Sequence, residues 1–302
     1  MATAARRPVT VLVAGWFSFL HGEATAGDVL SMEAVRACLA SEGVRHDVAW
    51  SPVMRPSGGL LLDDAQPGRY THLLFVCGPA HGRLVRELHE RFAGCRRIAI
   101  GVSVVDPGDP AVTGFHEVLP RDAPGGPVRP DLACVPVMPQ VPVVGVLLAH
   151  PQPEYGDHQV HVAVTGLLSS WLGGLGCARL ALDSRLDPRD WRLASAPDQF
   201  ESVLRRLDVV VTTRLHGLVL ALKNGVPALA VDAIAGGGKV AAQAAAWQWP
   251  AIVPAEELDR RVLDRHLAWC LSDPGRLAAR LAAVPAREPV EALLRHLPSL
   301  LR

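Results

Sequence analysis

The chain has little charge of either sign and very little lysine. Only 20% of its 302 residues are charged, and 30 basic residues balance 30 acidic ones, so the formal net charge is zero. Lys223 and Lys239 are its only lysines, and the other basic residues are arginine. An unspecific nucleic-acid binder usually carries a basic excess or a basic stripe. The composition therefore predicts that nucleic acid is not a partner.

Close cysteine pairs and long apolar segments are also missing from the sequence. The six cysteines are scattered with no Cys-x-x-Cys pair, which disfavours both a disulfide framework and structural zinc. His158 and His161 are spaced as neighbours on a helix, but no third ligand follows at a definite spacing. The apolar residues 9–14 are too few for a signal peptide, and no stretch approaches the roughly 20 residues of a membrane span. We expect a cytoplasmic protein without a membrane span or a metal site.

Apolar residues make up 49% of the chain, which is enough material for two cores. In the first half, short β-branched runs alternate with amphipathic stretches. Strands are predicted at residues 9–14, 44–50, 72–77 and 98–105, and helices at about 28–41 and 82–92. This alternation is typical of βαβ units in a parallel sheet.

A Pro- and Gly-rich stretch with little periodicity, residues 106–142, separates the two halves. We place the boundary near its end, giving lobes of residues 1–140 and 141–302. In the second lobe, strands are predicted at residues 143–149, 179–182, 207–211 and 226–231, and helices at 158–171, 197–206 and 215–223. After Lys239 the chain is expected to be helical to its end. The sequence therefore predicts an α/β protein with two doubly wound lobes facing each other across a cleft.

Residues 207–239, LDVVVTTRLHGLVLALKNGVPALAVDAIAGGGK, hold the candidate anion site. They are interpreted as strand, turn, helix, strand and glycine loop, so the turn and the loop emerge at the same carboxyl edge of a parallel sheet. Arg214 and His216 near the turn, and Gly237, Gly238 and Lys239 in the loop, are expected to converge on one anionic donor. Arginine offers a planar fork for carboxylate or phosphate, lysine a point charge, and histidine a proton near neutral pH.

Blander interpretations of the same residues remain open. A lone Arg or His after a strand is more often a surface or capping residue. The glycine loop is not a P-loop, because Ala233 and Val240 stand where that motif needs glycine and a hydroxyl residue. Arg185, after another predicted strand, is a candidate second anion contact.

In the first lobe, Asp28 follows the loop after the first strand. It is a candidate base for an acceptor hydroxyl, and equally a candidate helix-capping acid. Glu23 and Gly27, in the same loop, are the candidate acceptor-binding residues.

The segment TTRLHGLVLALKNGVPALAVD, followed by a glycine–lysine loop, resembles the C-terminal signature of the polysaccharide pyruvyl transferase family. The resemblance implies two Rossmann-like lobes in a GT-B-like fold, with the donor on the second lobe and the acceptor on the first. It also implies that Arg214 and His216 bind and activate phosphoenolpyruvate, and that Lys239 matches a family lysine. In the first lobe, Gly27 and Asp28 match a family turn in which Thr25 replaces asparagine.

The resemblance therefore implies a transferase that moves a pyruvyl or enolpyruvyl group from phosphoenolpyruvate to a hydroxyl of a sugar or secondary metabolite. Phosphoenolpyruvate would be a donor substrate, and no cofactor is expected. Two alternatives stay open: a GT-B glycosyltransferase that uses a nucleotide-sugar, and a catalytically silent binding member of the fold. Whether the chain forms a homo-oligomer is also left open.

Overall fold

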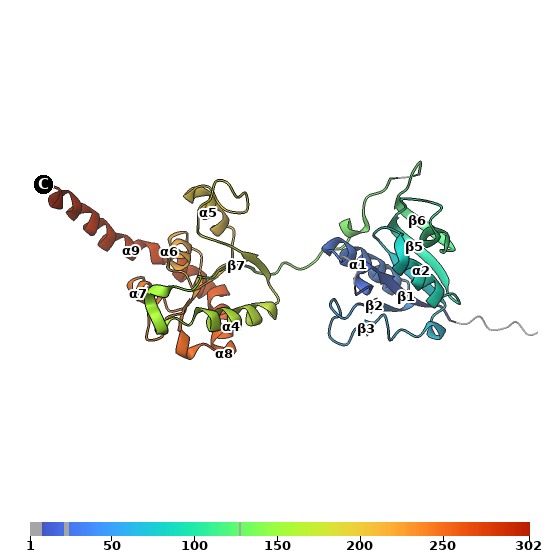
Figure 1. Cartoon of the computed structure of the whole chain (residues 1–302), viewed down its shortest axis with the longest axis horizontal. Coiled ribbons are helices and arrows are strands. Elements are labelled where there is room, and N and C mark those ends of the chain that lie inside the picture. Colours follow the sequence, from blue (N-terminus) through green and yellow to red (C-terminus); the bar gives the residue numbers. More distant parts are fainter. Residues whose placement is uncertain (1–7, 21–23, 127) are drawn as a thin grey trace, which may run out of the picture. The chain divides into compact units, whose positions relative to one another are not determined.

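The structure is a computed structural model that describes residues 8–20, 24–126 and 128–302. The chain divides into two compact units between Met138 and Pro139, and each is built on its own parallel sheet (Figure 1). The expected α/β fold with two doubly wound sheets is confirmed, and each unit is described by itself below. The division lies two residues before the predicted end of the first lobe at residue 140.

The described part of unit 1 contains six parallel strands in the order β3-β2-β1-β4-β5-β6, which is the Rossmann order. The strands are β1 (Thr10–Gly15), β2 (Arg45–Trp50), β3 (Leu60–Leu61), β4 (His72–Val76), β5 (Arg96–Ser103) and β6 (Glu117–Asp122). The α-helices are α1 (Ala26–Ser41), α2 (Gly82–Arg91) and α3 (Pro110–Thr113), and the 3-10 helices are η1 (Trp16–Ser18), η2 (Pro67–Arg69) and η3 (Leu132–Cys134).

The two faces of this sheet are covered by different helices, because side chains alternate along a strand. Val11 and Val13 of β1 pack in one cluster with Met32 of α1. Leu12 of β1 packs in another cluster with Leu88 of α2. One strand therefore supplies both cores of unit 1.

Unit 2 contains five parallel strands in the order β11-β10-β9-β7-β8. The strands are β7 (Val143–Leu147), β8 (Ala178–Ala181), β9 (Val209–Thr212), β10 (Ala228–Asp232) and β11 (Ile252–Pro254). The α-helices are α4 (His161–Gly173), α5 (Pro197–Leu204), α6 (Leu215–Lys223), α7 (Lys239–Ala246), α8 (Arg260–Leu271) and α9 (Asp273–Leu300), with 3-10 helices η4 (Pro153–His158) and η5 (Ala255–Glu257). The strand order reverses between β7 and β9, and in doubly wound sheets such a reversal marks the ligand-binding edge.

Three strands correct the sequence-based assignment. β3 lies in a segment to which the sequence assigned no element, β6 lies inside the stretch 106–142, and β11 lies where only helix was expected after Lys239. Each forms an edge of its sheet, and β3 and β11 are only two and three residues long. Edge strands need no continuous apolar run, so their sequences resemble loops.

The last helix, α9, is anchored to unit 2 through its first half. Gly275 packs so closely that an added Cβ would lie 2.1 Å from the Trp269 carbonyl oxygen, and Ala279 and Ala282 are buried. Leu293 and Leu294, further along, are exposed. Within the described residues, no helix is long and apolar enough to cross a bilayer.

Candidate functional site

A cavity of about 320 Å³ opens at the carboxyl edge of the unit 2 sheet. It is lined by residues that follow four of the strands: Ala149, His150, Pro151, Gln152, Ser184, Arg214, Leu215, His216 and Lys239. The structure thus brings Arg214, His216 and Lys239 together, as the sequence predicted from the edge of the sheet alone. Residues that follow β7 and β9, the two strands that flank the reversal, line this cavity.

Two buried threonines fix the turn that carries Arg214. The Thr212 hydroxyl donates to the Leu147 carbonyl at 2.9 Å and accepts from the Arg214 backbone N–H at 2.9 Å. The Thr213 hydroxyl accepts from the Ala149 backbone N–H at 2.7 Å. Both side chains are buried, so these bonds have no competition from bulk water. The end of β9 is thereby tied to the end of β7.

Gly217 seats the first turn of α6 directly on this threonine turn. A Cβ added to Gly217 would lie 2.1 Å from the Thr212 Oγ1 atom, well inside contact distance. Glycine is therefore required here by close approach rather than by backbone conformation. The glycine that ends the Arg-Leu-His-Gly segment is thus explained by its packing against Thr212.

The Arg214 side chain is held from two directions. Its Nε donates to the Leu148 carbonyl at 3.1 Å, and its Nη1 donates to Asp183 Oδ1 at 2.9 Å and to Ser184 Oγ at 3.2 Å. The side chain is 18% exposed. Nη2 has no hydrogen-bond partner among the described residues, so one arm of the guanidinium remains for a ligand.

Asp183 is the carboxylate that orients Arg214. Burial by itself raises the pKa of Asp183, but hydrogen bonds from the backbone and side chain of Arg185, with the charge of Arg214, outweigh it. The pKa of Asp183 is therefore held below its ordinary value. The Arg185 Nε donates to Asp183 Oδ2 at 2.8 Å, and the Arg185 side chain is largely exposed. Its neighbour Ser184 lines the cavity instead.

The glycine loop delivers Lys239 but not free backbone donors. The Gly238 N–H donates to Asp232 Oδ2 at 2.7 Å, and the Gly237 N–H donates to the Ile234 carbonyl at 3.0 Å. Gly237 has a φ of +89°, so it shapes the bend of the loop. Gly237 and Gly238 were predicted to bind the donor substrate. In this geometry neither has a free backbone N–H with which to do so.

Lys239, the first residue of α7, supplies the second cation of the cavity. Its Nζ lies 5.8 Å from the centre of the Tyr155 ring, within cation–π range. Asp232, which is buried, accepts from the Ala241 N–H at 2.8 Å and so caps α7. The carboxylate of Asp232 is bonded to the backbone at the start of α7, and no carboxylate lies within ion-pair distance of the Lys239 ammonium among the described residues.

His216 is the second residue of α6 and is exposed at the wall of the cavity. Its imidazole has no hydrogen-bond partner among the residues that the structure describes, and so it is available to a ligand. His161 differs, because its Nδ1 is buried without a partner and burial lowers its pKa. No group of three potential metal ligands occurs among the described residues.

Asp28 in unit 1 has the geometry of the capping alternative. Its Oδ2 accepts from the backbone N–H of Thr25 at 2.7 Å, and its Oδ1 accepts from the Cys77 thiol at 2.9 Å. Burial, followed by this hydrogen bond, raises the pKa of Cys77 to about 12. Gly27 lies in the first turn of the same helix. The acceptor roles of Asp28 and Gly27 stay predictions, and Glu23 lies outside the described residues.

Sequence reasoning missed several residues of the unit 2 cavity. It singled out Arg185 from the Asp-Ser-Arg segment, whereas Ser184 reaches the cavity and Asp183 orients Arg214. It also passed over His150 and Gln152, which follow β7. The available signal was their position directly after a strand that flanks the reversal, but the strand order was needed to use it.

Comparison with known proteins supports the resemblance noted in the sequence. The sequence model of the polysaccharide pyruvyl transferase family matches residues 180–233, which contain the end of β8, all of β9, the Arg-Leu-His turn and β10. The resemblance is thus confirmed over this segment, as a partial match consistent with a divergent member, and it indicates a transferase. Lys239 lies beyond the matched residues. No curated protein matches the chain.

Solved glycosyltransferase structures are also similar to the chain at low identity. The spinosyn forosaminyltransferase SpnP has 12% identity and a TM-score of 0.35, with 98% of this chain and 100% of that chain covered. SnogD from Streptomyces nogalater has 14% identity and a TM-score of 0.31, with coverages of 97% and 100%. MurG from Acinetobacter baumannii has 12% identity and a TM-score of 0.32, with coverages of 93% and 95%. At this level the similarities carry no information about substrates.

Gly217→Ala is expected to lower the free energy of unfolding by roughly 1–3 kcal/mol, the usual cost of overpacking. The added methyl meets the Thr212 hydroxyl, which is held by its own hydrogen bonds. Urea unfolding measures the change. Gly166→Ala in α4 is the matched control, since nothing lies within 4 Å of its added carbon. That control should gain about 0.5–1 kcal/mol, as helical Gly→Ala changes do; a similar gain from Gly217→Ala would refute the close contact.

Asp183→Asn is expected to lower stability at neutral pH by about 1–2 kcal/mol, because Arg214 loses a charged acceptor. Since the folded-state pKa of Asp183 is lowered, its contribution is complete above the unfolded value of about 3.9 and is lost as pH falls through the folded value. The difference between the two proteins should therefore shrink below about pH 4. Urea titrations at several pH values measure it.

Asp187→Asn is the control for this comparison. Asp187 accepts from the Arg189 backbone N–H in the same Asp-x-Arg arrangement, but it does not contact Arg214. It should cost less than Asp183→Asn at neutral pH. Equal losses would show that the Arg214 contact adds nothing to stability.

Proposed function

We propose that the protein is a carbohydrate-modifying transferase that uses phosphoenolpyruvate as its donor and a hydroxyl group as its acceptor. The observation that carries this proposal is the convergence of Arg214, His216 and Lys239 on one cavity of about 320 Å³. The family match over residues 180–233 supports the same assignment, since it includes Arg214 and His216.

The size and charge of the cavity suit a small molecule with two anionic groups. Its volume lies at the lower end of the roughly 300–1,000 Å³ that ligand pockets span. A three-carbon phosphate ester fits such a space better than a complete nucleotide-sugar does. The free arm of the Arg214 guanidinium suits a planar carboxylate or a phosphate, and the Lys239 ammonium suits the other anion.

In the proposed reaction, His216 is the general acid. Its imidazolium gives a proton to the methylene carbon of phosphoenolpyruvate, and the adjacent carbon becomes electrophilic. The oxygen of the acceptor hydroxyl bonds to that carbon, and the hydroxyl proton passes to solvent. Phosphate then departs with the electrons of its C–O bond. Attack by a second hydroxyl gives a ketal, whereas loss of a methyl proton gives an enolpyruvyl ether.

We do not assign the acceptor proton to Asp28, because Thr25 and Cys77 engage both of its oxygens.

Within unit 2, the hydrogen bonds of Arg214 to Leu148 and Asp183 hold the donor-binding group before the donor arrives. Such preorganisation avoids the cost of ordering the side chain during the reaction.

Phosphoenolpyruvate should stabilise the protein against heat without an added divalent cation. A ligand that binds only the native state stabilises it by about 2.7 kcal/mol at a hundredfold excess over Kd. Thermal shift with phosphoenolpyruvate, UDP-sugars and GDP-sugars measures this. Stabilisation by a nucleotide-sugar alone would favour a glycosyltransferase. Stabilisation by none of them would favour the catalytically silent alternative.

Arg214→Lys should lose most of the donor affinity although it keeps the charge. An ammonium cannot keep the contacts of the guanidinium to Asp183 and Leu148 and also present a separate N–H arm to the donor, and hydrogen bonds to charged groups contribute about 1.5–3 kcal/mol. Isothermal calorimetry with phosphoenolpyruvate measures the change. Arg205→Lys, on an exposed arginine at the end of α5, is the control and should bind like the wild type. Unchanged affinity in Arg214→Lys would make Arg214 a structural residue.

His216→Gln should leave donor affinity within a few fold, since the amide still donates a hydrogen bond. Turnover should fall by about 10² to 10⁴, the usual contribution of a positioned acid. Phosphate release with a panel of sugars and hydroxylated metabolites provides the assay. His158→Gln is the control, and wild-type turnover in His216→Gln would exclude the acid role.

A further inference from the structure

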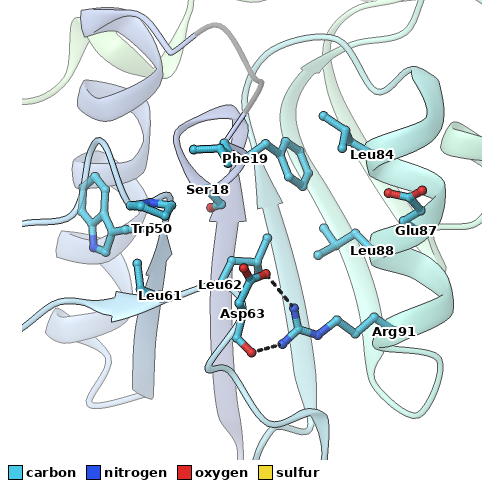
Figure 2. Close-up of a pocket in the computed structure, with 12 residues that line it drawn as sticks. Ser18, Phe19, Trp50, Leu61, Leu62, Asp63, Leu84, Glu87, Leu88 and Arg91 are labelled. Atoms are coloured by element: carbon cyan, nitrogen blue, oxygen red, sulfur yellow. Dashed lines mark hydrogen bonds and ion pairs between the residues drawn. The ribbon is translucent and has the colours of Figure 1, made fainter.

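Unit 1 contains a second cavity, of about 330 Å³, that the proposed chemistry does not use. Its walls are Ser18, Phe19 and Leu20 after β1, Trp50 at the end of β2 with Pro52 beyond it, the segment Leu61–Asp63, and one side of α2 (Figure 2). The loop after β1 places it beside the point where the Rossmann strand order reverses, between β1 and β4. Doubly wound sheets bind ligands at this edge.

The cavity exists because the connection between β3 and β4 contains no α-helix. Parallel strands are usually joined by a helix that covers the sheet. Here residues 62–71 make the crossing, with only the 3-10 helix η2. Nothing of helical width therefore fills the space between this connection and α2. Ala14 of β1 and Ala49 of β2, two of the strand residues of the same core, carry only a methyl group each.

The walls of this cavity are mostly apolar and are already ordered. Phe19 is 6% exposed and packs against Phe75, with ring centres 6.3 Å apart. Figure 2 shows its ring directed toward Leu84 and Leu88 of α2. Leu61, on the opposite wall, is only partly buried. A flat apolar ring that enters this space would cover exposed apolar surface without requiring the aromatic wall to rearrange.

Two of the polar groups at the cavity, Asp63 and Glu87, are carboxylates, which accept hydrogen bonds. Arg91 is already used, because its Nη2 donates to the Asp63 carbonyl at 2.9 Å and to the Ala65 carbonyl at 2.7 Å. Its guanidinium also lies beside the Asp63 carboxylate. Glu87, one turn earlier on α2, pairs only with the exposed Arg83, and such surface pairs contribute little. Glu87 is therefore available to a hydroxyl donor.

We propose that this cavity binds an uncharged ring-bearing small molecule, through apolar contact with Phe19 and Leu84 and a hydroxyl donated to Glu87. The size limits the bound part to one or two rings. The carboxylates of Asp63 and Glu87, and the backbone carbonyls that engage Nη2 of Arg91, disfavour an anionic ligand. Identifying this molecule as the acceptor rests on the proposed function, whereas the binding itself does not.

Binding of 7-hydroxycoumarin to the full chain, followed by fluorescence at a pH where the probe is neutral, tests the proposal. The matched probe 7-methoxycoumarin has the same rings but no donor. We expect the hydroxyl probe to bind about tenfold more tightly, which corresponds to about 1.4 kcal/mol. Glucose, which has hydroxyls but no apolar ring, should not compete. No binding of the hydroxyl probe at millimolar concentration would overturn the proposal.

Three variants, one of them a control, locate the binding. Leu84→Trp fills the cavity from α2 and should abolish binding, whereas Leu277→Trp places the same ring on exposed α9 and should not. Glu87→Leu should remove the tenfold preference for the hydroxyl probe while leaving the methoxy probe unaffected. Retained binding in Leu84→Trp, or a retained preference in Glu87→Leu, would refute the site.

The outcome is separable from that of the proposed function. Phosphoenolpyruvate stabilisation is measured on the same preparations and depends on unit 2. A protein that binds the coumarin but ignores phosphoenolpyruvate keeps this inference and loses the donor assignment. A protein that binds phosphoenolpyruvate but not the coumarin does the reverse.

Discussion

The geometry of the unit 2 cavity depends on two buried hydroxyl groups at the end of β9. Thr212 and Thr213 bond to Leu147 and Ala149, so the ends of β9 and β7 cannot separate without leaving buried polar groups unpaired. The chain therefore leaves the sheet in one direction, and Arg214 follows. Its guanidinium is then fixed from two strands away by Asp183, after β8. Binding geometry is thus supplied by the sheet rather than by loop flexibility.

The electrostatics of the cavity follow from how its carboxylates are employed. The single carboxylate of Asp183 bonds to both Arg214 and Arg185. It therefore orients the Arg214 guanidinium, while its one negative charge does not neutralise both positive charges. Asp232 is buried against the first backbone N–H groups of α7, where it balances the helix terminus. Lys239, which begins that helix, lines the cavity without a carboxylate partner among the described residues. A site built in this way favours an anion that brings more than one negative charge.

The sequence predicted the central part of this site because one rule was sufficient. Residues after consecutive parallel strands share an edge, so Arg214, His216 and Lys239 were expected together without knowledge of the strand order. The contact between Asp183 and Arg214 needed that order, since 31 residues separate the two. The capping of α7 by Asp232 could not be predicted for a related reason. The sequence does not show which backbone N–H groups a carboxylate at the end of a strand will accept from. The short edge strands β3 and β11 carried too few residues to show a periodicity.

The two units use the same kind of sheet edge for different chemistry. In unit 1, Asp28 in the first turn of α1 forms a capping box with Thr25 and accepts a hydrogen bond from the Cys77 thiol. The Asp28 carboxylate is therefore already hydrogen-bonded within the protein. Its cavity instead has apolar walls and hydrogen-bond acceptors, while the cavity of unit 2 has cations. A transferase that joins a small anion to a neutral hydroxyl compound needs one surface of each kind. The balance of 30 basic and 30 acidic residues therefore conceals a local division of charge, which net charge alone does not reveal.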